Sequence, residues 1–362
     1  MHFIRFLKVP STSTGTHSSS QSSRSRGSQG LVSVSALITI STDLNESFFA
    51  GNVTLRATLR ACDAPRPLVA QEFKWTKGMR SIPVNLTYQP AIRDAPLLGI
   101  MCISAAENRA DDMRTLYAGS SEARILSAWS TPFNILQSGS KAEALVERKL
   151  QLGTGMLRII EETREDIARH IWPGGLAISS YLSTLPSPPT GTLRSLEPIF
   201  SKSQIQVLEL GAGCGLAGLA LHAVMPKATV TVTDLPITAE ITSRNIELFT
   251  QAAQGPIQIR YEPLDWDESL PSWCSSTTYD LILVADCTYN TESIPYLVKV
   301  LDELCTISPD VTIFLAHKVR HDSEEMFFEM AKERGLVKTE QLVFEMAGDT
   351  VDLYIIRKEK KE

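Results

Sequence analysis

The stretch VLELGAGCGLAG, residues 207–218, places four glycines within twelve residues, directly after an apolar run. Two cofactor-binding patterns fit it. As GxGxxG, from Gly213 to Gly218, it matches the dinucleotide fingerprint. As ExGxGxG, from Glu209 to Gly215, it matches a turn that serves a different nucleoside cofactor. The stretch therefore predicts a strand, a glycine turn and a helix, and the residues around it have to distinguish the two ligands.

Predicted strands and helices alternate from Ile205 onward. The runs QVLEL, TVTVTD, IQIRYEPL, YDLILVAD and VTIFLAHK are apolar and rich in β-branched residues, and helices are expected after the glycines, through Glu247 and through Leu304. Such alternation is typical of βαβ units around a mostly parallel sheet. We therefore predict an α/β, Rossmann-like domain whose ligand lies at the carboxyl ends of the strands.

The first two strand ends carry acidic residues. The first strand ends at Glu209, and the second ends at Asp234, about 20 residues past the glycines, where an acidic residue meets ribose hydroxyls. Both candidate cofactors contain a ribose, so Asp234 fits either. A pyrophosphate disfavours a nearby carboxylate, whereas the sulfonium and ammonium groups of S-adenosylmethionine favour one. Glu209 therefore favours S-adenosylmethionine over a dinucleotide.

The glycines and the third strand end fit the same cofactor. Gly211, Gly213 and Gly215 would let the backbone approach the methionyl and ribose parts closely, because they lack a Cβ. The tripeptide LDW follows the third strand and supplies a carboxylate and an indole. Asp265 can accept from the exocyclic amine of adenine, and Trp266 can pack on the ring.

The fourth strand end delivers two candidate catalytic residues. YDLILVADCTYN places Asp286 and Tyr289 just beyond a run that has the pattern of a fully buried strand. Methyl transfer from S-adenosylmethionine is an in-line displacement that needs an oriented, neutral acceptor more than acid or base chemistry. A carboxylate and a phenol could accept from an incoming amine and align its lone pair. The alternatives are a helix cap for Asp286 and core packing for Tyr289.

These motifs, in this order, resemble the seven-β-strand protein-lysine methyltransferases that carry a DxxY motif. WPGGLAISSYL, ELGAGCGLAG, TVTDLP, LDW and ADCTY match its successive marks, and the resemblance covers about Leu150 to Arg357. It implies a seven-stranded methyltransferase domain with S-adenosylmethionine as cofactor, and Trp172 and Ala285 as further cofactor contacts. The chain departs from the usual pattern at Pro173, where the family has an acid or a small residue. As in fungal-type members, an extra region precedes the resemblance.

The resemblance also implies a protein acceptor, methylated on the ε-amine of a lysine, with translation elongation factors and chaperones as the implied acceptors. Fold does not fix substrate. A small-molecule N- or O-methyltransferase and a scaffold without catalysis therefore remain open.

The chain before Leu136 has a different texture, with short β-branched runs broken by turn residues. Residues 31–138 are expected to form a smaller β-rich domain that docks the acceptor, and residues 141–358 the methyltransferase domain. Within the latter, the charged segment 141–171 is predicted to be helical. Residues 1–30 are expected to be a strand followed by a Ser-rich disordered loop, although a mitochondrial transit peptide has a similar composition.

Composition narrows the partners. The 362 residues carry 41 acidic and 35 basic side chains, for a net charge of -6, so nothing favours nucleic acid or anionic lipid overall. The six cysteines include no CxxC pair, which argues against zinc and disulfides, and no metal site is predicted. His317 is expected to be a structural donor. A cytoplasmic monomer is expected, with nuclear or mitochondrial location left open.

Overall fold

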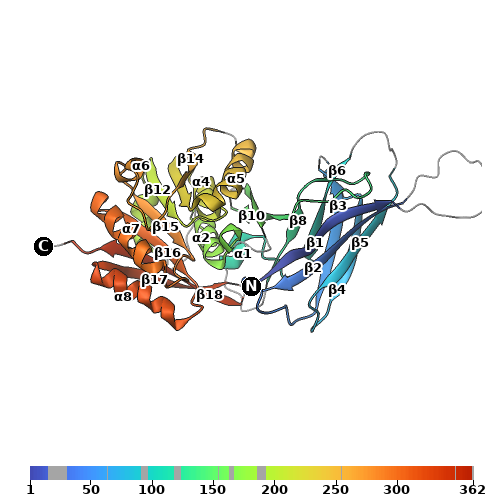
Figure 1. Ribbon diagram of the computed structural model, residues 1–362, viewed down its shortest axis with the longest axis horizontal. Coiled ribbons are helices and arrows are strands. Elements are labelled where there is room, and N and C mark those ends of the chain that lie inside the picture. Colours follow the sequence, from blue (N-terminus) through green and yellow to red (C-terminus); the bar gives the residue numbers. More distant parts are fainter. Residues whose placement is uncertain are drawn as a thin grey trace, which may run out of the picture. The chain divides into compact units, whose positions relative to one another are not determined.

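The computed structural model describes residues 1–14, 31–62, 64–90, 97–117, 124–153, 155–162, 167–185, 193–253, 255–346 and 348–360. They form two compact units (Figure 1). The first contains Met1–Asp111, Ala123–Lys149 and Glu161–Glu165, and the second contains Asp112–Glu122, Leu150–Ile160 and Asp166–Glu362. This division differs from the expected boundary at residues 138–141, because residues up to 149 belong to the first unit.

The first unit is built from one β-sheet and most of a second, which share one apolar core, as its alternating sequence pattern predicts; residues 150–160 of the second sheet belong to the second unit. One sheet has the order β5-β2-β1-β7, made of Ile82–Tyr88, Val32–Ser41, His2–Thr14 and Ile125–Leu126. The other has the order β11-β10-β8-β6-β3-β4, and β9 pairs with β6. Its strands are β11 (Gly155–Glu162), β10 (Leu145–Leu152), β8 (Ala128–Ser130), β6 (Leu98–Ala105), β3 (Val53–Ala61), β4 (Val69–Trp75) and β9 (Phe133–Asn134). Side chains such as Ile38, Leu59 and Ile103 from both sheets are fully buried in the shared core.

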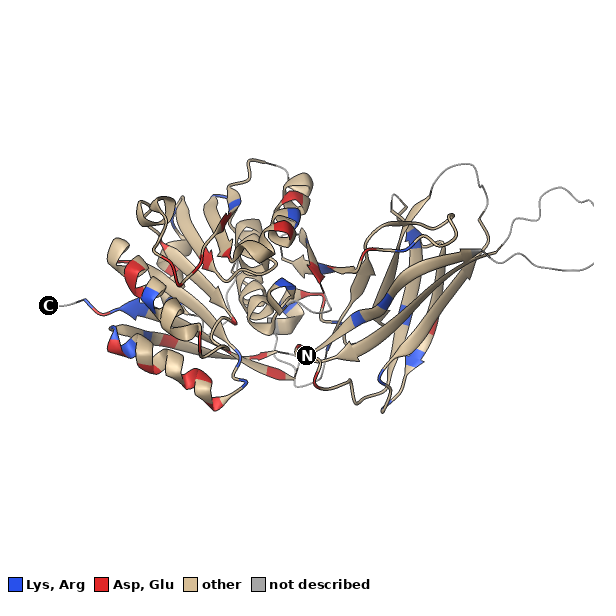
Figure 2. Cartoon of the chain, viewed as in Figure 1, with Lys and Arg blue, Asp and Glu red and all other residues tan. Residues whose placement is uncertain are grey.

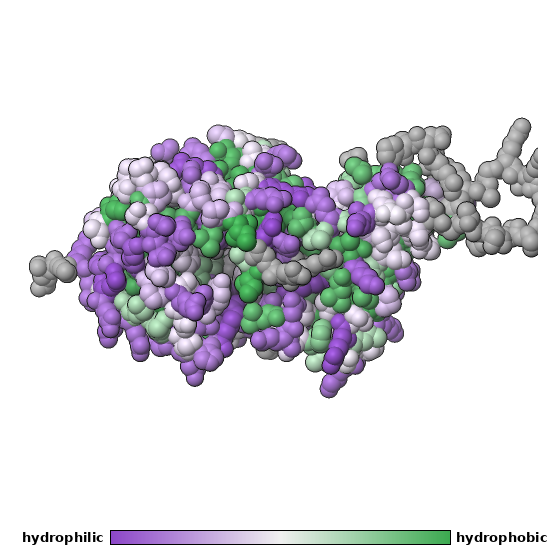
Figure 3. All heavy atoms as spheres, viewed as in Figure 1, coloured by the Kyte–Doolittle hydropathy of each residue, from purple (hydrophilic) through white to green (hydrophobic). Residues whose placement is uncertain are grey.

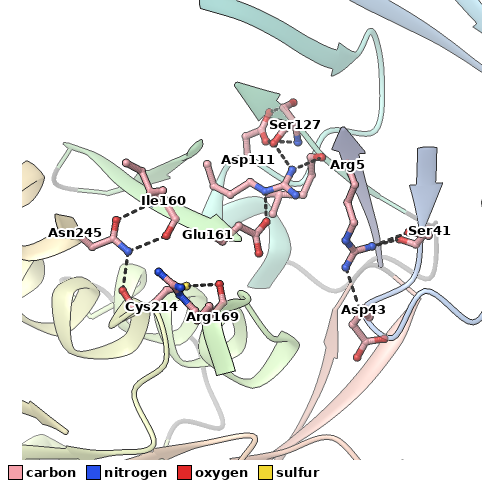
Figure 4. Close-up of polar contacts among 12 residues, drawn as sticks. Arg5, Ser41, Asp43, Asp111, Ser127, Ile160, Glu161, Arg169, Cys214 and Asn245 are labelled. Carbon is pink, nitrogen blue, oxygen red and sulfur yellow. Dashed lines mark hydrogen bonds and ion pairs between the residues drawn. The ribbon is translucent and has the colours of Figure 1, made fainter. Parts of the chain in front are cut away.

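Two buried arginines hold strands of the first unit together. Arg5 of β1 donates to the Ser41 hydroxyl at 2.6 Å and to the Asp43 carbonyl at 3.0 Å (Figure 4). Arg148 of β10 pairs with Glu161 of β11 at 2.6 Å, and both side chains are almost completely inaccessible. Because a buried charge is tolerated only when it is paired and hydrogen-bonded, these contacts fix how the strands lie beside each other.

The prediction of a helix over residues 141–171 is wrong. This segment forms β10, β11 and a 3-10 turn, η1 (Ile167–Arg169). Strand β10 pairs with β8 through Val146 and Glu147, and this pairing with a distant segment outweighs the local periodicity that suggested a helix. Pro173, which follows this segment, stands in the first turn of the next helix.

The N-terminal strand is longer than expected. The alternation in residues 3–9 predicts a strand, and β1 confirms it but continues to Thr14. Residues 11–14 therefore belong to the strand and not to the expected loop. The remainder of that loop, residues 15–30, lies outside the described residues.

The second unit has a seven-stranded sheet of order β14-β13-β12-β15-β16-β18-β17. The first five are parallel, and β18 and β17 are antiparallel. In that order the strands are Ile259–Pro263, Ala228–Asp234, Ile205–Leu210, Leu281–Ala285, Thr312–His317, Asp349–Lys358 and Leu336–Met346. The chain proceeds in one direction from β12 to β14 and then returns to β15 on the other side of β12. That reversal is a topological switch point, where open α/β sheets bind ligands.

Helices cover this sheet. They are α1 (Met113–Tyr117), α2 (Pro173–Ser183), α3 (Glu197–Phe200), α4 (Leu216–Val224), α5 (Ala239–Ala252), α6 (Ser272–Ser275), α7 (Ile294–Ile307) and α8 (Met326–Glu333), with 3-10 turns at η2 (Arg194–Leu196), η3 (Pro236–Thr238) and η4 (Asp322–Glu325). α2 packs on α4, and α7 packs on α8. In Figure 2 the charged positions gather on α5, α7 and α8, while most of the central sheet is free of them.

The face of the second unit seen in Figure 3 is largely hydrophilic, with separate apolar patches. No helix among the described residues is long and apolar enough to cross a membrane.

Candidate active site

A cavity of about 450 Å³ lies in the second unit, at the carboxyl ends of β12, β13, β14 and β15. Its volume falls within the 300–1,000 Å³ that is usual for small-molecule sites. Ten of the eleven predicted site residues line it: Trp172, Glu209, Gly211, Gly213, Asp234, Asp265, Trp266, Ala285, Asp286 and Tyr289. The eleventh, Gly215, does not line the cavity. It lies between the lining residues Cys214 and Leu216 and has a left-handed backbone conformation directly before α4.

The glycine loop is shaped by contacts inside the protein. Gly211 and Gly213 have φ values of 66° and 54°, in the left-handed region that favours glycine. A Cβ on Gly211 would stand 2.5 Å from the Cys287 sulfur, and one on Gly213 would stand 2.8 Å from the Ala168 carbonyl oxygen. The sequence predicts that these glycines make room for a cofactor. The structure shows that Cys287 and Ala168 of the same protein already leave no space for a side chain at these positions.

Two side chains fasten this loop. Asp234 accepts from the Gly213 amide at 2.7 Å with one carboxylate oxygen, and from the Leu235 amide at 2.7 Å with the other. Asn245 of α5 donates to the Cys214 carbonyl at 2.9 Å and exchanges two hydrogen bonds with the Ile160 backbone (Figure 4). The loop is thus held in place without a ligand, which lowers the ordering cost of binding.

Glu209, at the end of β12, is buried beneath the cavity. Its Oε2 atom accepts from the Gly218 amide at 2.8 Å, in the first turn of α4. Burial raises the pKa of Glu209 to about 8, and the negative charge of Asp234 adds to this, while the Gly218 and Ala217 amides oppose it. A cation bound in the cavity would lower the pKa of Glu209, because a nearby positive charge favours the ionised carboxylate.

The LDW segment supplies one acceptor and one donor to the wall. Asp265 is exposed and accepts from the Asp267 amide at 3.1 Å. Trp266 packs partly against the apolar core, and its buried indole Nε1 has no hydrogen-bond partner among the described residues. A buried donor without a partner carries a desolvation cost.

Asp286 lies in the left-handed region, with φ of 55°, and its side chain is only 2% exposed. Its Oδ2 atom accepts from the amide of Gly174 at the start of α2. Its Oδ1 atom accepts from the Lys318 amide at 3.3 Å and from Arg320 Nη1 at 3.1 Å. The carboxylate predicted to align an acceptor amine therefore ties together α2, the end of β15 and the segment after β16.

Arg320 is a residue of the site that the sequence motifs do not single out. Its guanidinium carbon lies 5.3 Å from the centre of the Trp172 ring, close enough for a cation–π contact, and Nη1 also donates to the Lys318 carbonyl at 3.2 Å. Trp172 in turn donates to the Ile167 carbonyl at 3.1 Å. In the sequence Arg320 is one of several basic residues after a strand, and nothing there indicates that it reaches Asp286.

His317 is buried and engaged within the fold, in keeping with a structural role. Its Nδ1 lies 2.7 Å from the Thr288 hydroxyl, and its Nε2 lies 3.8 Å from Glu324. Burial lowers the pKa of His317, so the ring is neutral near pH 7. Among the described residues, no group of three or more His, Cys, Asp or Glu side chains is placed to hold a metal ion.

The charge of the wall is one-sided. Six acidic residues line the cavity, namely Glu209, Asp234, Asp265, Asp267, Asp286 and Glu292, and no lysine or arginine among the described residues lines it. Glu209, with a pKa of about 8, is largely protonated near pH 7, and Asp286 pairs with Arg320, so the negative charge of the wall comes mainly from Asp234, Asp265, Asp267 and Glu292. These carboxylates suit a cationic ligand and oppose a pyrophosphate. Tyr289 and Tyr296, which are 51% and 40% exposed, stand where the cavity opens to solvent.

Comparison with known proteins points in the same direction. A UPF0665 family protein of Schizosaccharomyces pombe is 29% identical over 203 residues, which cover 56% of each chain. Protein N-lysine methyltransferase METTL21A of Danio rerio is 35% identical over 134 residues, covering 37% of this chain and 58% of that one. EEF1A lysine methyltransferase 3 of Mus musculus is 29% identical over 167 residues, covering 46% and 62%. The match thus spans less than two thirds of each relative.

The sequence model of the lysine methyltransferase family matches residues 152–334, which is just over half of the 362 residues and contains all eleven predicted site residues. The family inferred from the order of the motifs is therefore confirmed. This chain belongs to the lysine methyltransferase family.

Proposed function

We propose that the second unit is an S-adenosylmethionine-dependent methyltransferase that acts on the ε-amine of a lysine in another protein. The observation that carries the proposal is the cavity at the switch point, whose wall holds six acidic residues and, in the part of the chain that the structure describes, no lysine or arginine. Both the cofactor and the lysine acceptor bring positive charge, and a wall of this kind attracts both.

The residues present fit S-adenosylmethionine. Glu209 lies beneath the glycine loop, where it can pair with a positive group, and Asp234 lies at the end of β13, where an acid meets ribose hydroxyls. The Trp266 ring can pack on the adenine, and Asp265 can accept from its exocyclic amine. A dinucleotide would instead bring its pyrophosphate beside these carboxylates.

The cofactor, when bound, supplies an electrophilic methyl group, and the chain supplies position and exclusion of water. Tyr289, at the opening, can accept from the acceptor amine, and its ring and that of Tyr296 can displace water from it, which favours the neutral amine. We assign Asp286 a structural role: its carboxylate accepts hydrogen bonds from the Gly174 amide and from Arg320, and so fixes the position of the cavity wall.

A protein acceptor is supported by the names of two relatives, one a protein N-lysine methyltransferase and the other a lysine methyltransferase of EEF1A. We extend that acceptor class to this chain, with translation elongation factors and chaperones as the first candidates.

Calorimetric titration of the full chain with S-adenosylhomocysteine and with NAD tests the cofactor. Tight binding of the first and none of the second is expected, and the reverse would overturn the proposal. Incubation with methyl-labelled S-adenosylmethionine and a cell extract then tests the acceptor. Label in methyl-lysine of a discrete protein band supports the proposal, whereas label only in low-mass compounds, or no label, contradicts it. A Gly211→Ala variant serves as the cofactor-binding control.

A further inference from the structure

The opening of the cavity has a composition of its own. We call the rim the set of exposed residues Asp265, Asp267, Tyr289, Glu292 and Tyr296, all of which line the cavity. They come from two places: the segment after β14 and the stretch from the end of β15 into the first turn of α7. The rim therefore brings exposed residues of two separate loops together at one cavity.

The rim carboxylates lack counterions. Among the described residues, none of Asp265, Asp267 and Glu292 forms an ion pair. Lys299 donates to the backbone carbonyls of Asp267 and Glu268, both at 3.2 Å, and does not line the cavity. The opening thus presents carboxylates that form no ion pair among the described residues, although the Lys299 ammonium lies near Asp267.

Exposed apolar side chains surround the same opening. Besides the two tyrosines, Ile167 and Leu235 line the cavity while 53% and 45% exposed. Aromatic and aliphatic surface next to unpaired carboxylates is the arrangement that binds lysine and arginine, because the long stems pack on the rings while the charged heads pair with acids or lie over a ring face.

We propose that the rim binds a basic segment of the acceptor protein, in which lysine or arginine residues flank the lysine to be methylated. The flanking cations pair with Asp267 and Glu292, and their stems pack on Tyr289 and Tyr296. This inference rests on the proposed function and adds to it the chemistry of the sequence around the acceptor lysine.

The test uses fluorescent peptides and the full chain saturated with S-adenosylhomocysteine. Three peptides carry one lysine flanked on both sides by arginine, glutamine or glutamate, and their affinities are measured by anisotropy. An exposed ion pair contributes a factor of about two to five, so two pairs should favour the arginine peptide over the glutamine peptide by about tenfold. The glutamate peptide should bind more weakly than either.

A double variant, Asp267→Asn with Glu292→Gln, should lose most of this preference. The matched control, Glu329→Gln with Glu333→Gln on exposed positions of α8, changes the net charge equally and should keep it. Equal affinity of the arginine and glutamine peptides, no binding of any peptide, or an equal loss in the control would each overturn the proposal.

Calorimetry with S-adenosylhomocysteine separates this proposal from the one on which it rests. The double variant should bind this ligand as the parent does, and a loss in the variant alone would reassign Asp267 and Glu292 to the cofactor and overturn the rim proposal. Failure of the parent chain to bind it would instead count against the proposed function.

Discussion

Replacing Asp286 by alanine tests whether its carboxylate supports the fold or contacts the acceptor. The substitution removes the acceptor of three donors at once: the amides of Gly174 and Lys318 and the guanidinium of Arg320. Because the Asp286 side chain is 2% exposed and that of Arg320 14%, water can replace these bonds only partly. Alanine also tolerates a φ of 55° less well than aspartate does.

The expected magnitude follows from these contacts. Removing one partner of a buried ion pair costs about 3–5 kcal/mol, and Arg320 can recover part of this by turning toward solvent. We expect Asp286→Ala to lower the free energy of unfolding of the second unit by about 3–4 kcal/mol. Asp286→Asn keeps an acceptor for one amide and suits the left-handed backbone, so it should cost about 1–2 kcal/mol.

Urea unfolding, followed by tryptophan fluorescence, measures these free energies. Adding the Arg320→Met variant and the variant that combines it with Asp286→Ala completes a double-mutant cycle. In that cycle the Asp286 and Arg320 side chains should show a coupling energy of more than about 1 kcal/mol. Because Asp286 also holds Gly174 beside Trp172, S-adenosylhomocysteine affinity should fall in Asp286→Ala. The reasoning is refuted if this variant unfolds like the parent and binds the ligand normally while methyl transfer is lost. That outcome would return Asp286 to the acceptor-orienting role predicted from the sequence.

Three further predictions concern single side chains. Gly211→Ala places a Cβ 2.5 Å from the Cys287 sulfur at a left-handed φ, so it should lower the free energy of unfolding by about 1–3 kcal/mol and abolish S-adenosylhomocysteine binding in calorimetry. The pKa of Glu209 is raised from 4.5 to about 8, so between these values the folded protein holds a proton that the unfolded chain has released. The free energy of unfolding should therefore fall as the pH rises from 5 to 8, by about 3–4 kcal/mol, and Glu209→Gln should remove this dependence in urea titrations. In the first unit, Arg148→Leu leaves Glu161 without its ion-pair partner and should cost about 3–5 kcal/mol of stability, measured by circular dichroism, while ligand affinity stays within about twofold.

The composition of the cavity wall could be predicted because parallel strands bring their carboxyl ends to one edge. Glu209, Asp234, Asp265 and Asp286 are far apart in the chain, yet each stands at or just beyond a strand end, and all four line one cavity. Local patterns were enough to locate those ends. That the acids at these strand ends line one cavity then follows from the topology of the sheet alone.

Side-chain partners could not be predicted in the same way. Arg320 reaches Asp286 only because the segment after β16 turns back toward β15, and no spacing in the sequence indicates this. The β10–β11 hairpin shows a related failure. Its apolar residues fit a helix by periodicity, and the pairing of β10 with β8 that makes it a strand joins residues 16 to 18 positions apart, Val146 with Ser130 and Glu147 with Trp129.

Gly218 shows why one glycine stretch fits two fingerprints. In the dinucleotide pattern it is the third glycine, which allows close packing of a helix on a strand. Here a Cβ on Gly218 would stand 2.5 Å from Glu209 Oε2 and 2.6 Å from a methyl group of Val232. The glycine is therefore needed for helix–strand contact and for the carboxylate beneath it, whichever nucleoside is bound. Glu209, and not the glycines, distinguishes the two cofactors. Its carboxylate accepts a hydrogen bond from the Gly218 amide and places a titratable acid beneath the loop. A pyrophosphate would oppose ionisation of that acid, whereas a sulfonium or an ammonium would favour it, so the identity of the cofactor depends on the residue before the glycines.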